Sequence, residues 1–150
     1  MNQALLSSKE MDWCTPQDFF DELNALYHFV LDVAATHETA KCADYYTPET
    51  DGLVQSWYRA DGAVFCNPPY GRNICQWVKK AYDEAKSHHT TIVLLIPART
   101  DTAYFHRYIY NQPNVVIYFL RGRLKFERPD GTRMSTAPFP SMIVIFNPPK

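Results

Sequence analysis

Apolar side chains follow regular spacings along the chain. After Thr15 and Pro16 they recur at helical spacing as far as Tyr27, which predicts a helix capped by Thr15 with Pro16 in its first turn. The same spacing from about Asn73 predicts a second, longer helix with one apolar face. A third helix is predicted near residues 101–111.

Short apolar runs alternate with these helices. They predict strands at residues 27–35, 63–66, 91–96, 115–119 and 142–146, with a shorter strand around 123–126. The uninterrupted run at 91–96 is typical of a strand buried on both faces of a parallel sheet. The alternation predicts an α/β domain with a mainly parallel sheet, and the closing run of strands predicts an antiparallel C-terminal edge.

Length and composition are those of one globular unit. A chain of 150 residues with 46% hydrophobic residues can bury one core, so we expect a single domain, with residues 1–12 as a flexible extension. The sequence contains no run of eighteen apolar residues and no secretory leader pattern, so we expect a cytoplasmic protein without a membrane segment. The spacing of the four cysteines predicts free thiols and no metal site.

Charge is divided unevenly between the two halves of the chain. Residues 1–75 hold four Lys or Arg against eleven Asp or Glu, a balance of −7, whereas residues 76–150 hold eleven against five, a balance of +6. The net charge of −1 therefore hides a basic C-terminal half that could hold a polyanion. Charge alone leaves open the alternative of a solvated surface with scattered cations.

The segment Asn67-Pro68-Pro69-Tyr70 follows the strand predicted at 63–66 and is the first candidate for chemistry. Two prolines cannot join the hydrogen bonds of the sheet and have fixed φ, so they aim the Asn67 side chain. Its amide oxygen, with a nearby proline carbonyl, can accept both hydrogens of an amine, and Tyr70 offers a face for a planar ring. A proline-stiffened loop with a chance aromatic residue is the alternative.

Two other segments help to place this candidate. Asn147-Pro148-Pro149 is followed by neither an aromatic residue nor a helix, so we interpret it as a strand terminator. Asp32 lies within the strand predicted at 27–35, near its end, and ligands of parallel sheets bind beyond such carboxyl ends. Asp32 and Asn67 are therefore expected at the same edge of the sheet.

Asn67-Pro68-Pro69-Tyr70 resembles the catalytic motif of amino-methyltransferases that use S-adenosylmethionine, [Asn/Asp/Ser]-Pro-Pro-[Tyr/Phe/Trp]. An ordered set of segments over about residues 13–146 resembles the small phage-type, Dam-like DNA N6-adenine methyltransferases. These segments are Trp13-Cys-Thr-Pro16, Leu31-Asp-Val-Ala-Ala35, Ala40-Lys-Cys42, Asp51-Gly-Leu53 with Trp57, Asn67-Pro-Pro-Tyr-Gly71, Leu95-Ile-Pro-Ala-Arg-Thr-Asp-Thr102 and Gly122-Arg-Leu-Lys-Phe126. The resemblance implies one Rossmann-like methyltransferase domain, without a separate target-recognition domain, that acts in the host cytoplasm if it is encoded by a phage.

The resemblance further implies transfer of a methyl group from S-adenosylmethionine to the N6 amine of adenine in DNA. The displacement would be direct and in line, on a base turned out of the duplex. Asn67 and the Pro68 carbonyl would accept hydrogen bonds from the amine, Pro69 would stiffen the turn, and Tyr70 would stack on the base. The implied cofactor-binding residues are Trp13, Thr15, Pro16, Asp32, Ala34, Asp51 and Asn67.

DNA is accordingly the expected partner of the basic half, with the protein as a monomer or homodimer. Phosphate contacts are expected from Arg99, Arg121, Arg123, Lys125, Arg128 and Arg133. An ion pair between Arg99 and Asp101 that shapes their loop is the alternative for Arg99. Loops such as residues 127–138 or the segment after Tyr70 would recognise bases, which predicts a short or loosely specified target.

The sequence departs from the family pattern after the first strand. Many relatives carry a Phe-x-Gly-x-Gly loop there, whereas residues 32–38 contain no glycine, and the stretch up to Asn67 is too short for a helix, a strand and a second helix. We therefore expect a reduced cofactor half. Two alternatives stay open: methylation of cytosine N4 or of a protein glutamine, and a non-enzymatic DNA-binding protein that has lost the cofactor. The presence of both Asn67 and Tyr70 argues against the second.

Overall fold

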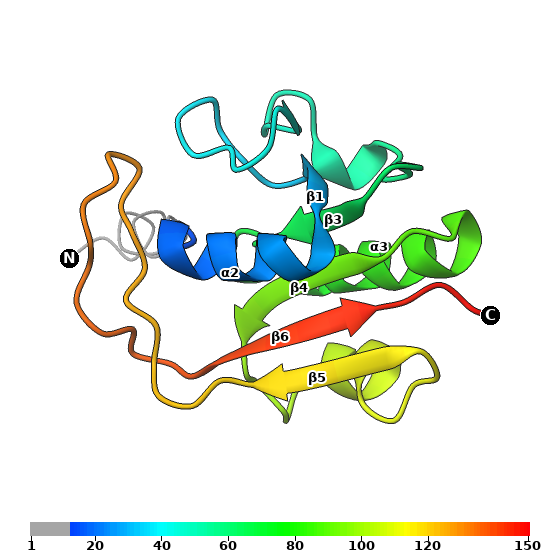
Figure 1. The fold of residues 1–150 in the computed structure, drawn as a ribbon. Coiled ribbons are helices and arrows are strands. Elements are labelled where there is room, and N and C mark those ends of the chain that lie inside the picture. The colour runs from blue at the N-terminus through cyan, green and yellow to red at the C-terminus, as the bar shows by residue number, and fades with distance from the viewer. Residues whose placement is uncertain (1–12) are drawn as a thin grey trace.

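A six-stranded sheet forms the centre of the computed structural model, which describes residues 13–150 (Figure 1). The extension predicted at residues 1–12 lies outside the described residues. The strand order is β2-β1-β3-β4-β6-β5, and β2, β1, β3 and β4 are parallel while β6 is antiparallel to both β4 and β5. The strands are β1 (Phe29–Asp32), β2 (Asp44–Tyr45), β3 (Ala63–Cys66), β4 (Ile92–Pro97), β5 (Val115–Phe119) and β6 (Ser141–Phe146). The predicted α/β architecture with an antiparallel C-terminal edge is confirmed.

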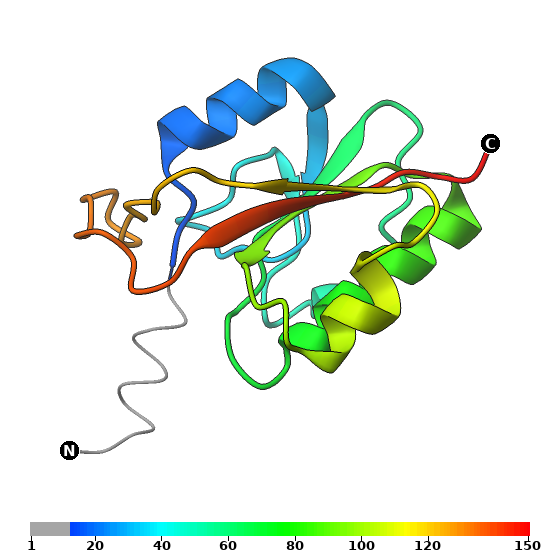
Figure 2. The same ribbon diagram turned by 90° about the horizontal axis from the view of Figure 1, so that it is seen from below.

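Helices cover both faces of the sheet (Figure 2). Helix α2 (Gln17–Tyr27) lies on one face, and helix α3 (Ile74–His88) lies on the other, together with the π-helical turn Phe105–Ile109. Both α-helices bury one side, as the helical spacing of their apolar residues predicts. A short 3-10 helix, Gly52–Val54, follows β2.

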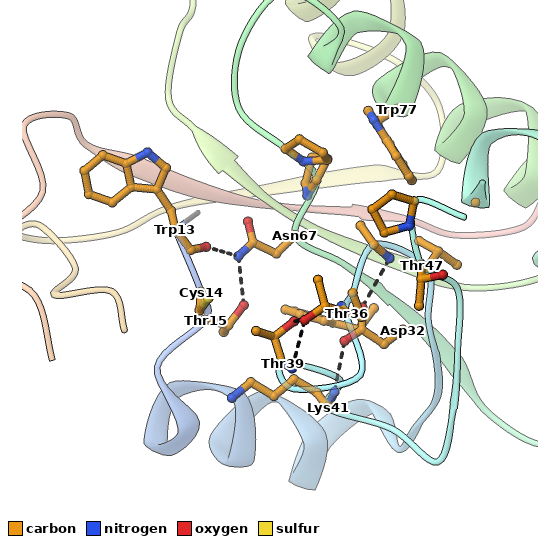
Figure 3. Close-up of a pocket in the computed structure, with 18 of the residues that line it drawn as sticks. Trp13, Cys14, Thr15, Asp32, Thr36, Thr39, Lys41, Thr47, Asn67 and Trp77 are labelled. Carbon is orange, nitrogen blue, oxygen red and sulfur yellow. Dashed lines mark hydrogen bonds between the residues drawn. The ribbon is translucent and has the colours of Figure 1, made fainter. Parts of the chain in front are cut away.

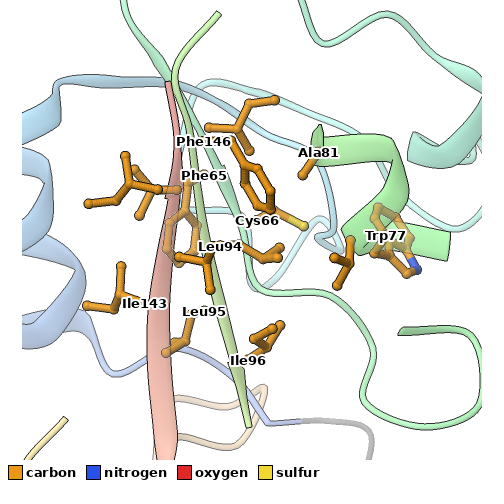
Figure 4. Packing of buried hydrophobic residues seen from close by; sticks show 14 of the residues in the cluster. Phe65, Cys66, Trp77, Ala81, Leu94, Leu95, Ile96, Ile143 and Phe146 are labelled. Atoms are coloured by element: carbon orange, nitrogen blue, oxygen red, sulfur yellow. The ribbon is translucent and has the colours of Figure 1, made fainter. Parts of the chain in front are cut away.

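The core is built around three strands, β3, β4 and β6, which are buried along their whole length. Their side chains, among them Phe65, Leu94 and Ile143, pack in the layers between α2 and α3 (Figure 4). A strand covered on both faces is apolar at every position, because both sets of its side chains leave water. This explains why continuous apolar runs predicted these strands well.

Two strand predictions were wrong, one in its length and the other in that no strand forms. The strand predicted at 27–35 covers only Phe29–Asp32, because the Asp32 carboxylate accepts hydrogen bonds from backbone amides beyond it and the chain turns out of the sheet. No strand forms at 123–126 within the described structure. The next residue, Glu127, forms two isolated bridges instead. One joins it to Cys14, before α2, and the other joins it to Arg133 in the following loop.

Two helix predictions also need correction. Thr15 does not cap α2: Pro16 occupies the N-cap position, and the free amide of Gln17 donates to Oε1 of Glu127 instead. The helix predicted near 101–111 is present but shorter: residues 103–109 are helical, with the π-helical turn Phe105–Ile109 as their main part, where the Tyr110 nitrogen donates to the Phe105 oxygen. Asn111 then adopts a positive φ of 57°, which ends the turn.

The connection from β1 to β3 contains β2 and the 3-10 helix but no α-helix, which agrees with the expected reduced half. The two residues of β2 were missed because such a short strand leaves no periodic signal in the sequence. Among residues 13–150 no helix has the length and apolar character needed to span a bilayer.

Candidate functional site

A cavity of about 870 Å³ opens beyond the carboxyl ends of β1 and β3 (Figure 3). It is lined by the segment before α2, by the loops between β1 and β3, and by the turn after β3 with part of α3. Eight predicted site residues line it: Trp13, Thr15, Asp32, Ala34, Asp51, Asn67, Pro68 and Pro69. Pro16 and Tyr70 are buried in the protein and do not belong to this lining.

The side-chain amide of Asn67 is held by the segment before α2. Its Nδ2 donates to the carbonyl oxygen of Trp13 at 2.7 Å and to Oγ1 of Thr15 at 3.0 Å (Figure 3). A carbonyl oxygen can only accept, so this contact determines which end of the amide is nitrogen. Oδ1 of Asn67 is left buried and without a hydrogen-bond partner among the described residues. Because an unpaired buried acceptor is costly, this oxygen would be stabilised by a hydrogen-bond donor brought next to it.

Pro68 and Pro69 account for the position of this amide. Strand β3 ends at Cys66, and neither proline has an N–H group that could continue its pairing. Both prolines line the cavity next to Asn67. The stiff exit from the strand, expected from the sequence, therefore leaves Asn67 at the end of β3.

Asp32 places a buried carboxylate in the same cavity, with 3% of its surface exposed. Oδ1 accepts a hydrogen bond from the Ala34 nitrogen at 3.3 Å, and Oδ2 accepts one from the Lys41 nitrogen at 3.0 Å. Burial raises the pKa of Asp32 to about 6, and the two amides and the Lys41 charge oppose this shift. At neutral pH the carboxylate is ionised and offers a negative charge to a cationic ligand.

Hydroxyl groups, rather than glycines, close the turn after β1. The Thr36 nitrogen donates to Oγ1 of Thr39 at 3.0 Å, and the Thr39 nitrogen donates to Oγ1 of Thr36 at 3.2 Å. The Ala35 nitrogen donates to the Tyr46 oxygen at 2.9 Å, which ties the turn to the chain after β2. With the Asp32 carboxylate, these bonds give the turn a defined shape without a glycine-rich sequence.

The opposite wall contains residues that sequence reasoning did not assign to the site, including Gly52, Leu53 and Trp77. A Cβ on Gly52 would stand 2.2 Å from the Val33 oxygen and 3.2 Å from the Trp77 ring, so glycine is required there. Trp77 lies on the buried side of α3 and is only 7% exposed, so it belongs to the core, but it also borders the cavity. The segment Asp51-Gly-Leu53 belongs to the family resemblance found in the sequence, but only Asp51 was assigned to the site there.

Tyr70 is packed into the core beside the cavity. Its hydroxyl donates to the Leu95 oxygen at 3.1 Å, and its ring meets Phe126 and Phe139 edge-on, with centroids 6.1 and 5.6 Å apart. Burial raises the pKa of the Tyr70 hydroxyl well above its usual range, so the group stays neutral. Stacking of Tyr70 on a base stays a prediction and requires that one face of the ring be uncovered.

The predicted phosphate-binding residues are all exposed but differ in their contacts. Arg133 pairs with Asp18 at 3.2 Å and lies 3.9 Å from Glu127, while Arg128 donates to Oγ1 of Thr132 and to the Arg133 carbonyl. These two arginines stabilise the loop at residues 127–133. Within residues 13–150, no ion pair is formed by Arg99, Arg121, Arg123 or Lys125, so the proposed Arg99–Asp101 pair is absent there.

Cys42, Cys66 and Cys75 are free, and burial raises the pKa of the Cys66 thiol well above its usual value. In the described part of the chain, no three His, Cys, Asp or Glu side chains gather into a group that could hold a metal ion.

Known proteins are similar to this chain over almost its whole length. The family model for DNA N-6-adenine-methyltransferase (Dam) matches residues 3–150. A DNA N-6-adenine-methyltransferase of Haemophilus phage HP1 is 28% identical over 147 residues, which cover 95% of this chain and 81% of the relative. Another, of Escherichia phage T1, is 33% identical over 105 residues, which cover 69% of this chain but 43% of the relative, less than half of its length. The resemblance found in the sequence is confirmed: the chain belongs to the DNA N-6-adenine-methyltransferase (Dam) family.

Proposed function

We propose that this protein transfers a methyl group from S-adenosylmethionine to the N6 amine of adenine in DNA. Its family supports a DNA adenine methyltransferase, and the names of the two phage relatives favour adenine over cytosine N4 or a protein glutamine. One observation carries the proposal. Asn67 lines the cavity, and its Oδ1 is buried and has no hydrogen-bond partner among the described residues. An amine donor is the kind of group that this oxygen lacks.

The cavity fits the methyl donor in size and chemistry. Its volume of about 870 Å³ lies in the range of small-molecule sites, roughly 300–1,000 Å³. The Asp32 carboxylate would contact the positively charged part of the methyl donor, and Leu53 and Trp77 would contact its apolar surface. When bound, S-adenosylmethionine would supply a methyl group on a positively charged sulfur: the amine nitrogen bonds to the methyl carbon as the carbon–sulfur bond breaks, the sulfur leaves as a neutral thioether, and the methylated amine loses a proton to water.

Asn67 would orient the amine. Its Oδ1 would accept one N6 hydrogen and the Pro68 carbonyl the other, which leaves the lone pair of the nitrogen free to attack. These bonds favour the positive charge that develops on the nitrogen, so orientation and electrostatics supply the catalysis without a covalent enzyme intermediate. Pro69 limits the movement of the turn, and Tyr70 would support the base.

A cell-based measurement tests the proposal. DNA from a methylation-deficient host that expresses the protein is digested to nucleosides and analysed by mass spectrometry, beside hosts that express Asn67→Ala or Thr90→Val. Thr90 is buried between α3 and β4, and its hydroxyl donates to the His88 oxygen, away from the cavity. N6-methyladenine should appear with the parent and Thr90→Val and be absent with Asn67→Ala.

Two results would contradict the proposal. If the parent yields no N6-methyladenine, or if methylation persists in Asn67→Ala, the assigned reaction or the assigned site is wrong. Calorimetry with S-adenosylmethionine adds a separate test, because a DNA-binding protein that has lost its cofactor would show no binding heat. Asn67→Ala should still bind the methyl donor, since Asp32 and the far wall remain.

A further inference from the structure

We propose that Thr15 is a positioning residue: its hydroxyl, with the Trp13 carbonyl, holds the Asn67 amide so that Oδ1 is free to accept the target amine. The inference rests on the proposed function. It also gives Thr15 a role different from the cofactor contact that the family resemblance implies, because the hydroxyl oxygen of Thr15 is bonded to Asn67.

The contacts of Asn67 leave little freedom to its amide. Both hydrogens of Nδ2 have acceptors, the Trp13 carbonyl at 2.7 Å and Oγ1 of Thr15 at 3.0 Å. A half-turn of the amide would set Oδ1 against the Trp13 carbonyl, acceptor to acceptor, and would point the N–H groups toward the amine. In that orientation Asn67 could not grip an amine donor.

Thr15 is well placed to impose this orientation, since it is 4% exposed and held on both sides. Cys14 and Glu127 exchange backbone hydrogen bonds of 3.1 and 2.9 Å just before it. The Gln17 nitrogen donates to Oε1 of Glu127 at 3.2 Å just after it, at the start of α2. A hydroxyl held between two such contacts can fix the direction of the amide that it binds.

The Trp13 carbonyl belongs to the backbone and persists in any variant, whereas the Thr15 hydroxyl can be removed alone. Thr15→Val keeps the branched shape and buried volume but lacks an acceptor for Nδ2. The amide then keeps a single bond and can swing about it. Thr15→Ser retains the hydroxyl and tests whether the oxygen, rather than the methyl group, matters.

Steady-state methylation of an adenine-containing duplex distinguishes positioning from binding. For Thr15→Val we expect kcat to fall by about tenfold to a hundredfold, with KM for S-adenosylmethionine and for DNA within about twofold of the parent. Thr15→Ser should recover kcat to within about threefold. Thr90→Val, a matched buried threonine away from the cavity, should behave as the parent. NMR should also show faster hydrogen exchange at the Asn67 side-chain amide in Thr15→Val.

Several results would overturn the inference. An increased KM for S-adenosylmethionine at unchanged kcat in Thr15→Val would assign Thr15 to the cofactor. Equal kcat in Thr15→Val and Thr90→Val, or failure of Thr15→Ser to recover it, would exclude positioning by the hydroxyl. If Thr15→Val loses its folded state, Thr15→Ser decides: a kcat within about threefold of the parent supports positioning by the hydroxyl, and a larger loss excludes it. If the parent is inactive or Asn67→Ala is active, the proposed function fails instead, and this inference falls with it.

Discussion

Asp32 and Lys41 are joined by a hydrogen bond of 3.0 Å from the Lys41 backbone nitrogen to Oδ2 of Asp32. The bond closes the turn after β1 around a buried carboxylate, and the Ala34 nitrogen occupies the other carboxylate oxygen. The two amides stabilise the charged form, but burial outweighs them and raises the pKa. The site therefore carries an ionised group at a cost in folding free energy.

Stability should consequently depend on pH through Asp32. With a pKa of about 6 when folded and 3.8 when unfolded, the native state binds more protons between these pH values. The contribution of Asp32 to the free energy of unfolding is thus fully present below about pH 4 and lost by about pH 6, a change on the order of 3 kcal/mol. Urea unfolding of the parent and Asp32→Asn from pH 4 to 7 should show the difference shifting in favour of the variant as pH rises. Parallel pH profiles would exclude this effect.

Asn67→Asp should impair the protein, although aspartate occurs at this place in the motif of related amino-methyltransferases. A carboxylate oxygen would replace Nδ2 and face the Trp13 carbonyl, which now lies 2.7 Å away. We expect a loss of about 1–3 kcal/mol in the free energy of unfolding at pH 8 and a methylation rate at least about tenfold lower. At acidic pH the new carboxyl group would be protonated and could donate to the carbonyl, so the loss of stability should shrink. Parent-like activity would show that the Trp13 carbonyl does not select asparagine.

The fold was predictable where burial leaves a simple pattern in the sequence. Strands β3, β4 and β6 are buried on both faces, and their apolar runs gave their positions to within about a residue. The alternating segment at 123–126 looks like a strand, but a strand needs a neighbour, and tertiary structure places Glu127 against Cys14 instead. Local pattern cannot supply that information.

The site was predictable to the extent that strand ends define it. Asp32 and Asn67 follow from the rule that ligands bind beyond the carboxyl ends of parallel strands. The bond between Thr15 and Asn67 joins residues 52 positions apart, and no spacing in the sequence announces it. Thr15 looked like a helix cap because its hydroxyl suits that role equally well.

Tyr70→Phe and Tyr70→Ala separate the hydroxyl from the ring. Phenylalanine removes the bond to the Leu95 oxygen and should cost about 1 kcal/mol in unfolding free energy, with methylation within a few-fold of the parent. Alanine also empties the space beside Phe126 and Phe139 and should cost about 3 kcal/mol or more, with loss of methylation. Urea unfolding and the methylation assay measure both. Equal loss of activity in the two variants would assign the function to the hydroxyl rather than to stacking.

Gly52→Ala and Gly122→Ala separate two effects of an added Cβ on stability: a clash with neighbouring atoms at Gly52 and an unfavourable positive φ at Gly122. At Gly52 the added Cβ meets the Val33 oxygen at 2.2 Å, so we expect a loss of about 1–3 kcal/mol in stability and weaker binding of S-adenosylmethionine. At Gly122, with φ of 75°, nothing lies within 4 Å, so strain alone should cost about 1 kcal/mol. Calorimetry should find donor binding unchanged in Gly122→Ala. Unaltered donor affinity in Gly52→Ala would remove this wall from the site.

Arg121 and Arg123 should contribute to DNA affinity through phosphate contacts. Both are exposed and form no ion pair within residues 13–150, whereas Arg133 is engaged by Asp18. The double variant Arg121→Ala/Arg123→Ala should reduce the slope of log affinity against log salt by about 2, because each lost phosphate contact removes roughly 0.9. Fluorescence anisotropy with a labelled duplex at several salt concentrations measures the slope. Lys86→Ala, an exposed change near the end of α3, provides the control and should leave the slope as it is. An unchanged slope in the double variant would show that DNA approaches another face. Calorimetry with S-adenosylmethionine serves as a second control, because donor binding should be unaffected in either case.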